Sequence, residues 1–154
     1  MNKSYYADSS ALIKRHAPET GSVWIKQEFS PIAGNEIITS KLSIAEVLSG
    51  LNRRKRETSI SAADYGKFSK DFTAVSRFQY RLIDLTDAIL LEAQRLLENH
   101  PLRAGDAIQL ASALLANAGL QSANLPALIF LASDARLLTA ATSEGLQTDD
   151  PQNH

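Results

Sequence analysis

The sequence of 154 residues contains no cysteine, and this absence excludes several classes of site. Disulfide frameworks, thiolate zinc sites, iron–sulfur clusters and a cysteine nucleophile all need cysteine thiols. Histidine is also scarce: His16, His100 and His154 are the three present, and no two of them have the close spacing of a two-histidine zinc motif. Side chains that carry oxygen therefore remain for chemistry.

Long apolar segments are missing as well. The most apolar segment, residues 125–132, is much shorter than the roughly 18 residues of a membrane span. The first 15 residues hold Asp8 and basic residues around a very short apolar stretch, whereas an export signal needs an apolar core of roughly 7 to 15 residues. We therefore expect a cytoplasmic protein that has no membrane partner.

An excess of one charge is absent too. The formal net charge is −1, from 16 basic and 17 acidic residues, so total charge gives no argument for nucleic-acid binding. With 44% hydrophobic and 21% charged residues, the composition is typical of one globular domain. A chain of this length folds without a metal, so a bound metal would serve chemistry. We expect one domain over residues 1–148 and a polar C-terminal tail over residues 149–154.

Short apolar segments alternate with segments of helical periodicity. Strands are predicted over residues 4–7, 37–39, 80–85 and 128–131. Ser61, with Asp64 three residues later, predicts the start of a helix that runs to about Arg77, and Thr86 predicts the start of the next. Pro18 is expected in the first turn of a helix that ends near Phe29. This alternation predicts an α/β fold around a parallel sheet.

Four acids are placed where they can converge. Asp8 and Asp134 each follow an apolar strand, while Glu46 and Asp106 lie in early turns of helices that start from the same side of the sheet. Clustered buried carboxylates repel one another unless divalent cations neutralise them. Mg²⁺ binds carboxylate and phosphate oxygens, polarises a phosphodiester and acidifies water. The four acids therefore indicate metal-dependent phosphodiester hydrolysis.

Each acid, taken alone, also has a simpler structural role. Asp8 or Asp134 can serve only as the cap of the helix that follows it. Glu46 can lie on a solvated helix edge, and Asp106 can complement a helix dipole. Periodicity does not separate these roles from a shared metal site.

Four segments together resemble the acidic motifs of PIN-domain proteins, and in particular the small VapC-type toxins of toxin–antitoxin pairs. The segments occur in the family's order and are Tyr6-Ala7-Asp8-Ser9-Ser10-Ala11-Leu12, Ser40-Lys41-Leu42-Ser43-Ile44-Ala45-Glu46-Val47, Leu102-Arg103-Ala104-Gly105-Asp106-Ala107-Ile108-Gln109-Leu110-Ala111 and Ser133-Asp134-Ala135-Arg136-Leu137. The resemblance implies a three-layer sandwich with four or five short parallel strands. It also implies a Mg²⁺-dependent endoribonuclease, with Mn²⁺ as a possible substitute, that forms a homodimer and is inhibited by a cognate antitoxin.

The resemblance also assigns roles to residues. Asp8 and Asp106 would be the main metal ligands, Glu46 a ligand directly or through water, and Asp134 the outer acid of the pocket. Ser10 matches a small polar position that supports the first acid in the family. The chain departs from the family near the fourth acid, where Ala132 stands at a usual Ser or Thr position and the adjacent Ser133 would be the supporting residue instead. It also departs at residues 147–150, which are more polar than the family's terminal strand.

Basic residues near these motifs are candidate contacts to RNA phosphates. Arg53 and Arg54 belong to a basic run at the end of the helix that carries Glu46, although such residues also complement a helix C-terminus. Lys14, Arg15 and Arg103 lie closer in sequence to the acids. We interpret all five as possible phosphate contacts.

Three alternatives compete with a nuclease. One is a catalytically silent PIN-like module that only binds a partner or RNA. Another is an α/β phosphatase of the haloacid dehalogenase type, which needs a second Asp two residues after the first, where this chain has Ser10. A phospho-receiver domain would need a Lys after its last strand, and residues 146–154 contain none.

Overall fold

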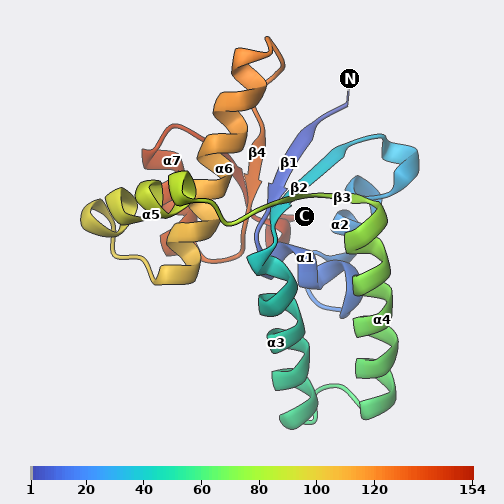
Figure 1. The fold of residues 1–154 in the computed structure, drawn as a ribbon. Helices are drawn as coiled ribbons and strands as arrows, with labels where there is room; N and C mark the ends of the chain where they lie inside the picture. The colour runs from blue at the N-terminus through green and yellow to red at the C-terminus, as the bar shows by residue number, and fades with distance from the viewer. Residues whose placement is uncertain (1) are drawn as a thin grey trace.

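The computed structural model describes residues 2–154, and its five strands form one parallel sheet in the order β3-β2-β1-β4-β5 (Figure 1). The strands are β1 (Ser4–Ala7), β2 (Glu36–Ser40), β3 (Tyr80–Ile83), β4 (Ile129–Leu131) and β5 (Gln147–Asp149). The helices are α1 (Ser9–His16), α2 (Ser22–Glu28), α3 (Leu42–Arg56), α4 (Ala62–Phe78), α5 (Asp87–Asn99), α6 (Ala104–Ser122) and α7 (Ala135–Ser143), with short 3₁₀ turns η1 (Pro31–Ala33) and η2 (Pro151–Asn153). The predicted α/β fold is confirmed.

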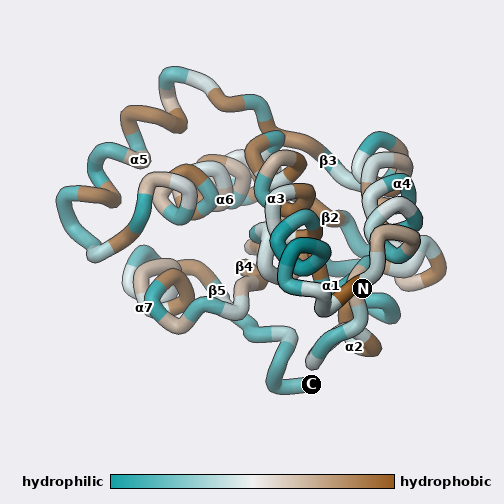
Figure 2. Tube along the Cα trace, turned by 90° about the horizontal axis from the view of Figure 1, so that it is seen from below, coloured by the Kyte–Doolittle hydropathy of each residue, from teal (hydrophilic) through white to brown (hydrophobic). Residues whose placement is uncertain are grey.

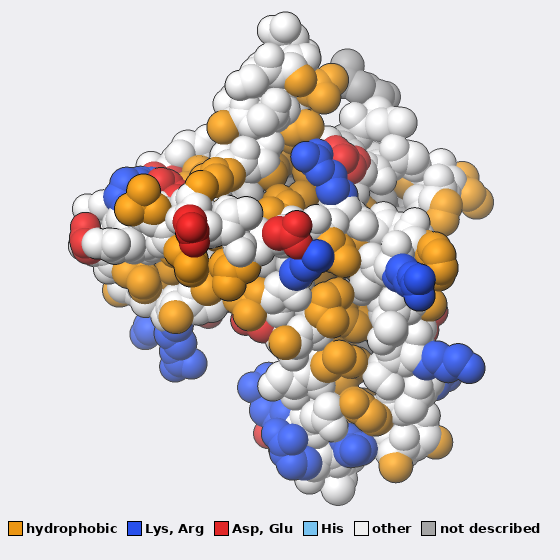
Figure 3. Space-filling model, in the orientation of Figure 1, with side chains coloured by type: hydrophobic (Ala, Val, Ile, Leu, Met, Phe, Trp, Pro, Cys, Tyr) orange, Lys and Arg blue, Asp and Glu red, His pale blue; other side chains and the backbone are white. Residues whose placement is uncertain are grey.

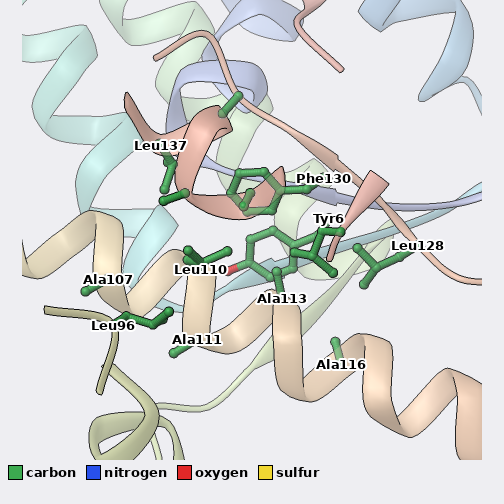
Figure 4. Close-up of a cluster of buried hydrophobic side chains, with 14 of the residues drawn as sticks. Tyr6, Leu96, Ala107, Leu110, Ala111, Ala113, Ala116, Leu128, Phe130 and Leu137 are labelled. Atoms are coloured by element: carbon green, nitrogen blue, oxygen red, sulfur yellow. The ribbon is translucent and has the colours of Figure 1, made fainter. Parts of the chain in front are cut away.

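Successive side chains of the central strand β1 point to opposite faces of the sheet, and each face has its own hydrophobic core. Tyr5 and Ala7 of β1 pack against α1 to α4, whereas Tyr6 points to the opposite face and packs against α5, α6 and α7. Tyr6 is paired in register with Ile38 and Phe130, and its ring stacks on that of Phe130 with centroids 5.6 Å apart (Figure 4). Figure 2 shows the strands between these two groups of helices, which is the three-layer sandwich expected from the sequence.

Local sequence signals locate most helix starts. The predicted Ser61–Asp64 capping box is formed, and the Thr86 side chain accepts a hydrogen bond from the Ile89 N–H. The prediction for Pro18 is wrong: it lies between α1 and α2, and α2 starts at Ser22. Gly21, with a φ of 90°, provides the left-handed residue before that helix.

The C-terminal residues expected as a polar tail are packed against the domain. Gln147 to Asp149 pair with β4, and Pro151 is buried. The ring of His154 stacks on Trp24 of α2 with centroids 4.1 Å apart. The boundary expected at residue 148 thus falls inside a strand, because β4 supplies the main-chain partners that hold this polar segment.

The chain order reverses at β1. From β1 the chain builds β2 and β3 on one side and later returns to place β4 and β5 on the other. In parallel sheets, binding sites form beyond the carboxyl ends of the strands at such a point. Within residues 2–154, no helix has the length and apolar character needed to cross a membrane.

Candidate active site

All four predicted acids line a single cavity of about 720 Å³ at this reversal point. Asp8 follows β1 and caps α1, and Asp134 follows β4 and caps α7. Glu46 comes from α3, and Asp106 from the first turn of α6. We call this cavity the acidic pocket, defined by Asp8, Glu46, Asp106 and Asp134.

Asp8 is the deepest of these acids, with 5% of its surface exposed. One carboxylate oxygen accepts hydrogen bonds from the Ser10 hydroxyl at 2.6 Å and the Ala11 N–H at 3.0 Å. Burial raises the pKa of Asp8 to about 7. The two hydrogen bonds oppose this shift, and the negative charges of Glu46 and Asp106 add to it. Ser10, expected to support the first acid, contacts it directly.

Glu46 is held by a buried polar network centred on Gln109 of α6. The Gln109 amide donates to Glu46 at 2.6 Å and to the Ser43 hydroxyl at 2.9 Å, and its oxygen accepts from the Tyr6 hydroxyl at 2.7 Å. Burial raises the pKa of Glu46, the Gln109 hydrogen bond lowers it, and the charge of Asp106 raises it. The network thus orients Glu46 from the core side.

Asp106 and Asp134 form the other side of the pocket. One Asp134 oxygen accepts from the Leu137 N–H at 3.0 Å, so the capping role that this acid could have alone is present within the shared pocket. Burial raises the pKa of Asp106, the charge of Asp134 raises it further, and the nearby Arg103 lowers it. Three of the four acids therefore have raised pKa values in a shared cavity.

These four side chains suit a hard divalent cation by their chemistry. Oxygen donors are the ligands that Mg²⁺ and Mn²⁺ prefer, and a cation would relieve the repulsion among the carboxylates. Within residues 2–154, no three Asp, Glu or His side chains are gathered closely enough to hold a metal as they stand.

Three arginines surround the acids without pairing with them. Arg53, Arg103 and Arg136 are exposed and line the acidic pocket, and within residues 2–154 none of them forms an ion pair. Figure 3 shows a hollow between α3, at the lower centre, and the part of the molecule around α5, at the left, with Lys and Arg side chains on both sides of the hollow. Their guanidinium groups are therefore available to an anionic ligand.

The other residues predicted to assist the site lie at different places. Arg15 is remote from the acidic pocket, because its guanidinium donates to Gln79 at 2.7 Å and to the Tyr80 hydroxyl at 3.4 Å. Lys14 and Arg54 line an adjoining cavity. The backbone N–H of Ser133 donates to Ser10 at 2.9 Å, whereas its hydroxyl donates to Asp150. Ser133 thus reaches Asp8 through Ser10 rather than through its own hydroxyl.

Sequence reasoning missed three residues of the site. Gln109 is a buried amide on a largely apolar helix, and that contrast was the available signal. Gly105 faces Glu46, whose carboxylate oxygen would lie 3.1 Å from an added Cβ. Arg136 follows Asp134 by two residues and lines the pocket from α7. No sequence pattern distinguishes Gly105 or Arg136 from an ordinary residue of a helix N-terminus.

Comparison with known proteins decides the family. A sequence model described as the PIN domain matches residues 5–140. The chain belongs to the PIN-domain family. A relative named Ribonuclease VapC45, from Mycobacterium tuberculosis (strain CDC 1551 / Oshkosh), is 30% identical over 150 residues, which cover 96% of this chain and 95% of that protein.

Solved structures of low sequence identity share this PIN fold. A toxin–antitoxin complex from Klebsiella pneumoniae matches with a TM-score of 0.63 and 17% identity, covering 96% of this chain and 97% of that one. The Mycobacterium tuberculosis protein VapC20, described as a Sarcin-Ricin loop cleaving toxin, matches with a TM-score of 0.62 and 15% identity, covering 92% and 95%. The expected family and its fold are thus confirmed.

Proposed function

We propose that this PIN-domain protein is a Mg²⁺-dependent endoribonuclease and the toxin of a toxin–antitoxin pair. The observation that supports this most strongly is the convergence of four carboxylates in one cavity at the sheet's reversal point. The 30% identical relative is itself named a ribonuclease. We propose that the protein acts on RNA in the cytoplasm.

The residues of the acidic pocket have distinct proposed roles. Asp8 and Asp106 would be the main ligands of Mg²⁺ or Mn²⁺, assisted by Glu46 and Asp134. Bound metal would polarise the phosphodiester and supply an acidified water for its hydrolysis. Hydrogen bonds from Ser10 and the Ala11 N–H favour the ionised form of Asp8 that a metal would bind, and Gln109 orients Glu46.

The arginines of the rim bind the substrate in this proposal. Arg53 extends from α3 on one side of the acidic pocket, while on the other Arg103 directly precedes α6 and Arg136 lies in the first turn of α7. Guanidinium groups bind phosphate oxygens through two parallel hydrogen bonds. An RNA backbone that crosses the pocket would therefore meet arginines on both sides of the scissile phosphate.

Two protein partners are part of the proposal. A cognate antitoxin would inhibit the nuclease, consistent with the toxin–antitoxin complex from Klebsiella pneumoniae that shares the fold. We also propose a homodimer, which sedimentation equilibrium of the purified protein tests. A molar mass near twice 16.8 kDa is expected, and a mass that stays at the monomer value at all concentrations contradicts it.

Cleavage of RNA tests the proposed activity. Purified protein, shown by mass spectrometry to carry no antitoxin, is incubated with total RNA and with defined tRNAs in Mg²⁺ or in EDTA. We expect cuts only with the metal, and their loss in the variants Asp8→Asn and Asp106→Asn. Glu98→Gln, which changes an exposed acid on α5, is the matched control and should cut normally. Cleavage that persists in EDTA or in both pocket variants would overturn the proposal.

A further inference from the structure

A second cavity, of about 390 Å³, adjoins the acidic pocket. Ser9, Ser10, Glu46 and Arg53 line both cavities, so the two are neighbours across these residues. The second cavity alone is lined by Lys14, Arg54, Glu19, Thr20, Ser133 and Gln152 among others. We call it the basic cavity, because Lys14, Arg53 and Arg54 outnumber its two acids, Glu19 and Glu46.

Lys14 is the unusual residue of the basic cavity. It is a lysine with 3% of its surface exposed, although lysines are almost never buried without full pairing. Its ammonium has three donor hydrogens and, within residues 2–154, one hydrogen-bond partner, a Glu19 oxygen at 3.0 Å. The protein's own groups therefore compensate only part of the desolvation free energy of this charge.

Glu19 does not neutralise the cavity, because it is shared. Its other oxygen accepts from an Arg54 guanidinium nitrogen at 2.9 Å, so one carboxylate serves two cations. Arg54 is further fixed by donating to the Gly50 carbonyl at 3.1 Å. Arg53, at the boundary of both cavities, has no ion-pair partner among residues 2–154. The cavity thus retains excess positive charge beside the acids, and two of its cations, Lys14 and Arg54, are held in place by Glu19.

We propose that the basic cavity is a substrate subsite that binds the RNA phosphate and nucleotide next to the scissile bond. The proposal rests on the endoribonuclease function proposed above. Lys14 supplies unused ammonium hydrogens to the phosphate, and Arg53 spans the boundary between the neighbouring phosphates. Thr20, Ser133 and Gln152 also line the basic cavity, and in this proposal they face the ribose and base. The subsite fixes the direction in which RNA crosses the acidic pocket.

Two sets of variants test the subsite by steady-state cleavage of an RNA segment that the unaltered protein cuts. Lys14→Met removes the buried charge, and we expect KM to rise about tenfold with a much smaller change in kcat. Gln152 is exposed, so Gln152→Glu and Gln152→Lys change the charge of the cavity with little risk to folding. We expect KM to rise about threefold with Glu and to fall about threefold with Lys.

Gln121→Glu and Gln121→Lys provide the matched controls, because Gln121 is exposed on α6 and lines neither cavity. If the subsite is correct, each Gln121 variant should change KM by less than half as much as the corresponding Gln152 variant. Equal effects at residues 121 and 152 would overturn the proposal, since the charge would then act over the whole surface. An unchanged KM in folded Lys14→Met would also overturn it; if that variant does not fold, the Gln152 series decides.

The proposed subsite and the proposed nuclease can fail separately. If the unaltered protein cuts no RNA, the nuclease proposal fails, and the same variants are compared by fluorescence anisotropy with labelled tRNA. Weaker binding by Gln152→Glu than by Gln121→Glu would then support an RNA-binding cavity without cleavage. Equal binding by these two variants, or binding by neither them nor the unaltered protein, would overturn the subsite.

Discussion

The side chain of Gln109 connects the core to the acidic pocket, and its removal tests the network around Glu46. Gln109→Leu replaces the amide by an apolar side chain of similar size and leaves the buried Tyr6 hydroxyl without its acceptor. We expect the free energy of unfolding, measured in urea, to fall by about 2 kcal/mol. Gln94→Leu on the exposed side of α5 should change it by less than about 0.5 kcal/mol. Equal stability of both variants would show that the network contributes nothing.

Single residues of the site differ in how far the sequence reveals them. Asp8 and Asp134 could be placed because each directly follows an apolar strand, and parallel strands end at the same edge. Arg15 could not, because its direction depends on contacts with Gln79 and Tyr80, more than 60 residues away. The sequence predicts a phosphate contact for Lys14, but the burial of this lysine follows only from the packing of α1.

At the scale of one helix, α6 carries two glycines whose surroundings differ. An added Cβ at Gly119 would meet open space, whereas at Gly105 it would lie 3.1 Å from the Glu46 carboxylate. Gly119→Ala should raise the free energy of unfolding by about 0.5 to 1 kcal/mol with cleavage unchanged. Gly105→Ala should lower cleavage about tenfold, because Glu46 must move. Cleavage equal in the two variants would contradict the assigned place of Glu46.

The contact between η2 and the start of α2 is an element-scale feature that the sequence did not predict. An added Cβ at Gly21 would clash with the Pro151 carbonyl oxygen, whereas at Gly145, which has nearly the same φ, it would meet nothing within 4 Å. In urea denaturation, Gly145→Ala should lower the free energy of unfolding by about 1 kcal/mol, and Gly21→Ala should lower it by about 3 kcal/mol. Equal costs would show that the C-terminal segment does not pack on α2.

The polar composition of residues 149–154 explains why the sequence predicts a tail there. The hydrogen-bond partners of this segment come from β4 and its stacking partner is Trp24, so its order depends on contacts that are distant in sequence. In contrast, the layered architecture could be predicted, because strand and helix periodicities are local properties of the chain. Short-range patterns thus revealed the sheet and most helices, but not the strand β5 at its edge or the packing of the C-terminal residues on α2.

For the whole molecule, the acidic pocket predicts how stability depends on pH. The pKa of Asp8 is raised from 3.8 to about 7, mainly by burial, with the charges of Glu46 and Asp106 contributing. Between these values the folded protein holds a proton that the unfolded chain releases, so stability falls as pH rises. In EDTA, we expect the free energy of unfolding measured in urea to fall by about 2 to 4 kcal/mol more in the unaltered protein than in Asp8→Asn when the pH rises from 4 to 8. Parallel pH profiles of the two proteins would contradict this prediction.

The central claim is that four acids from distant parts of the chain form one divalent-cation site, and direct metal binding tests it. Electron paramagnetic resonance measures Mn²⁺ bound to the unaltered protein, to each of the variants Asp8→Asn, Glu46→Gln, Asp106→Asn and Asp134→Asn, and to the control Glu98→Gln. We predict that the unaltered protein and the control bind Mn²⁺ with equal affinity and that excess Mg²⁺ displaces it. Asp8→Asn and Asp106→Asn should bind Mn²⁺ at least about tenfold more weakly. Glu46→Gln and Asp134→Asn should lose less affinity. Mn²⁺ binding of unchanged affinity in Asp8→Asn and Asp106→Asn, or none by the unaltered protein, would contradict the account.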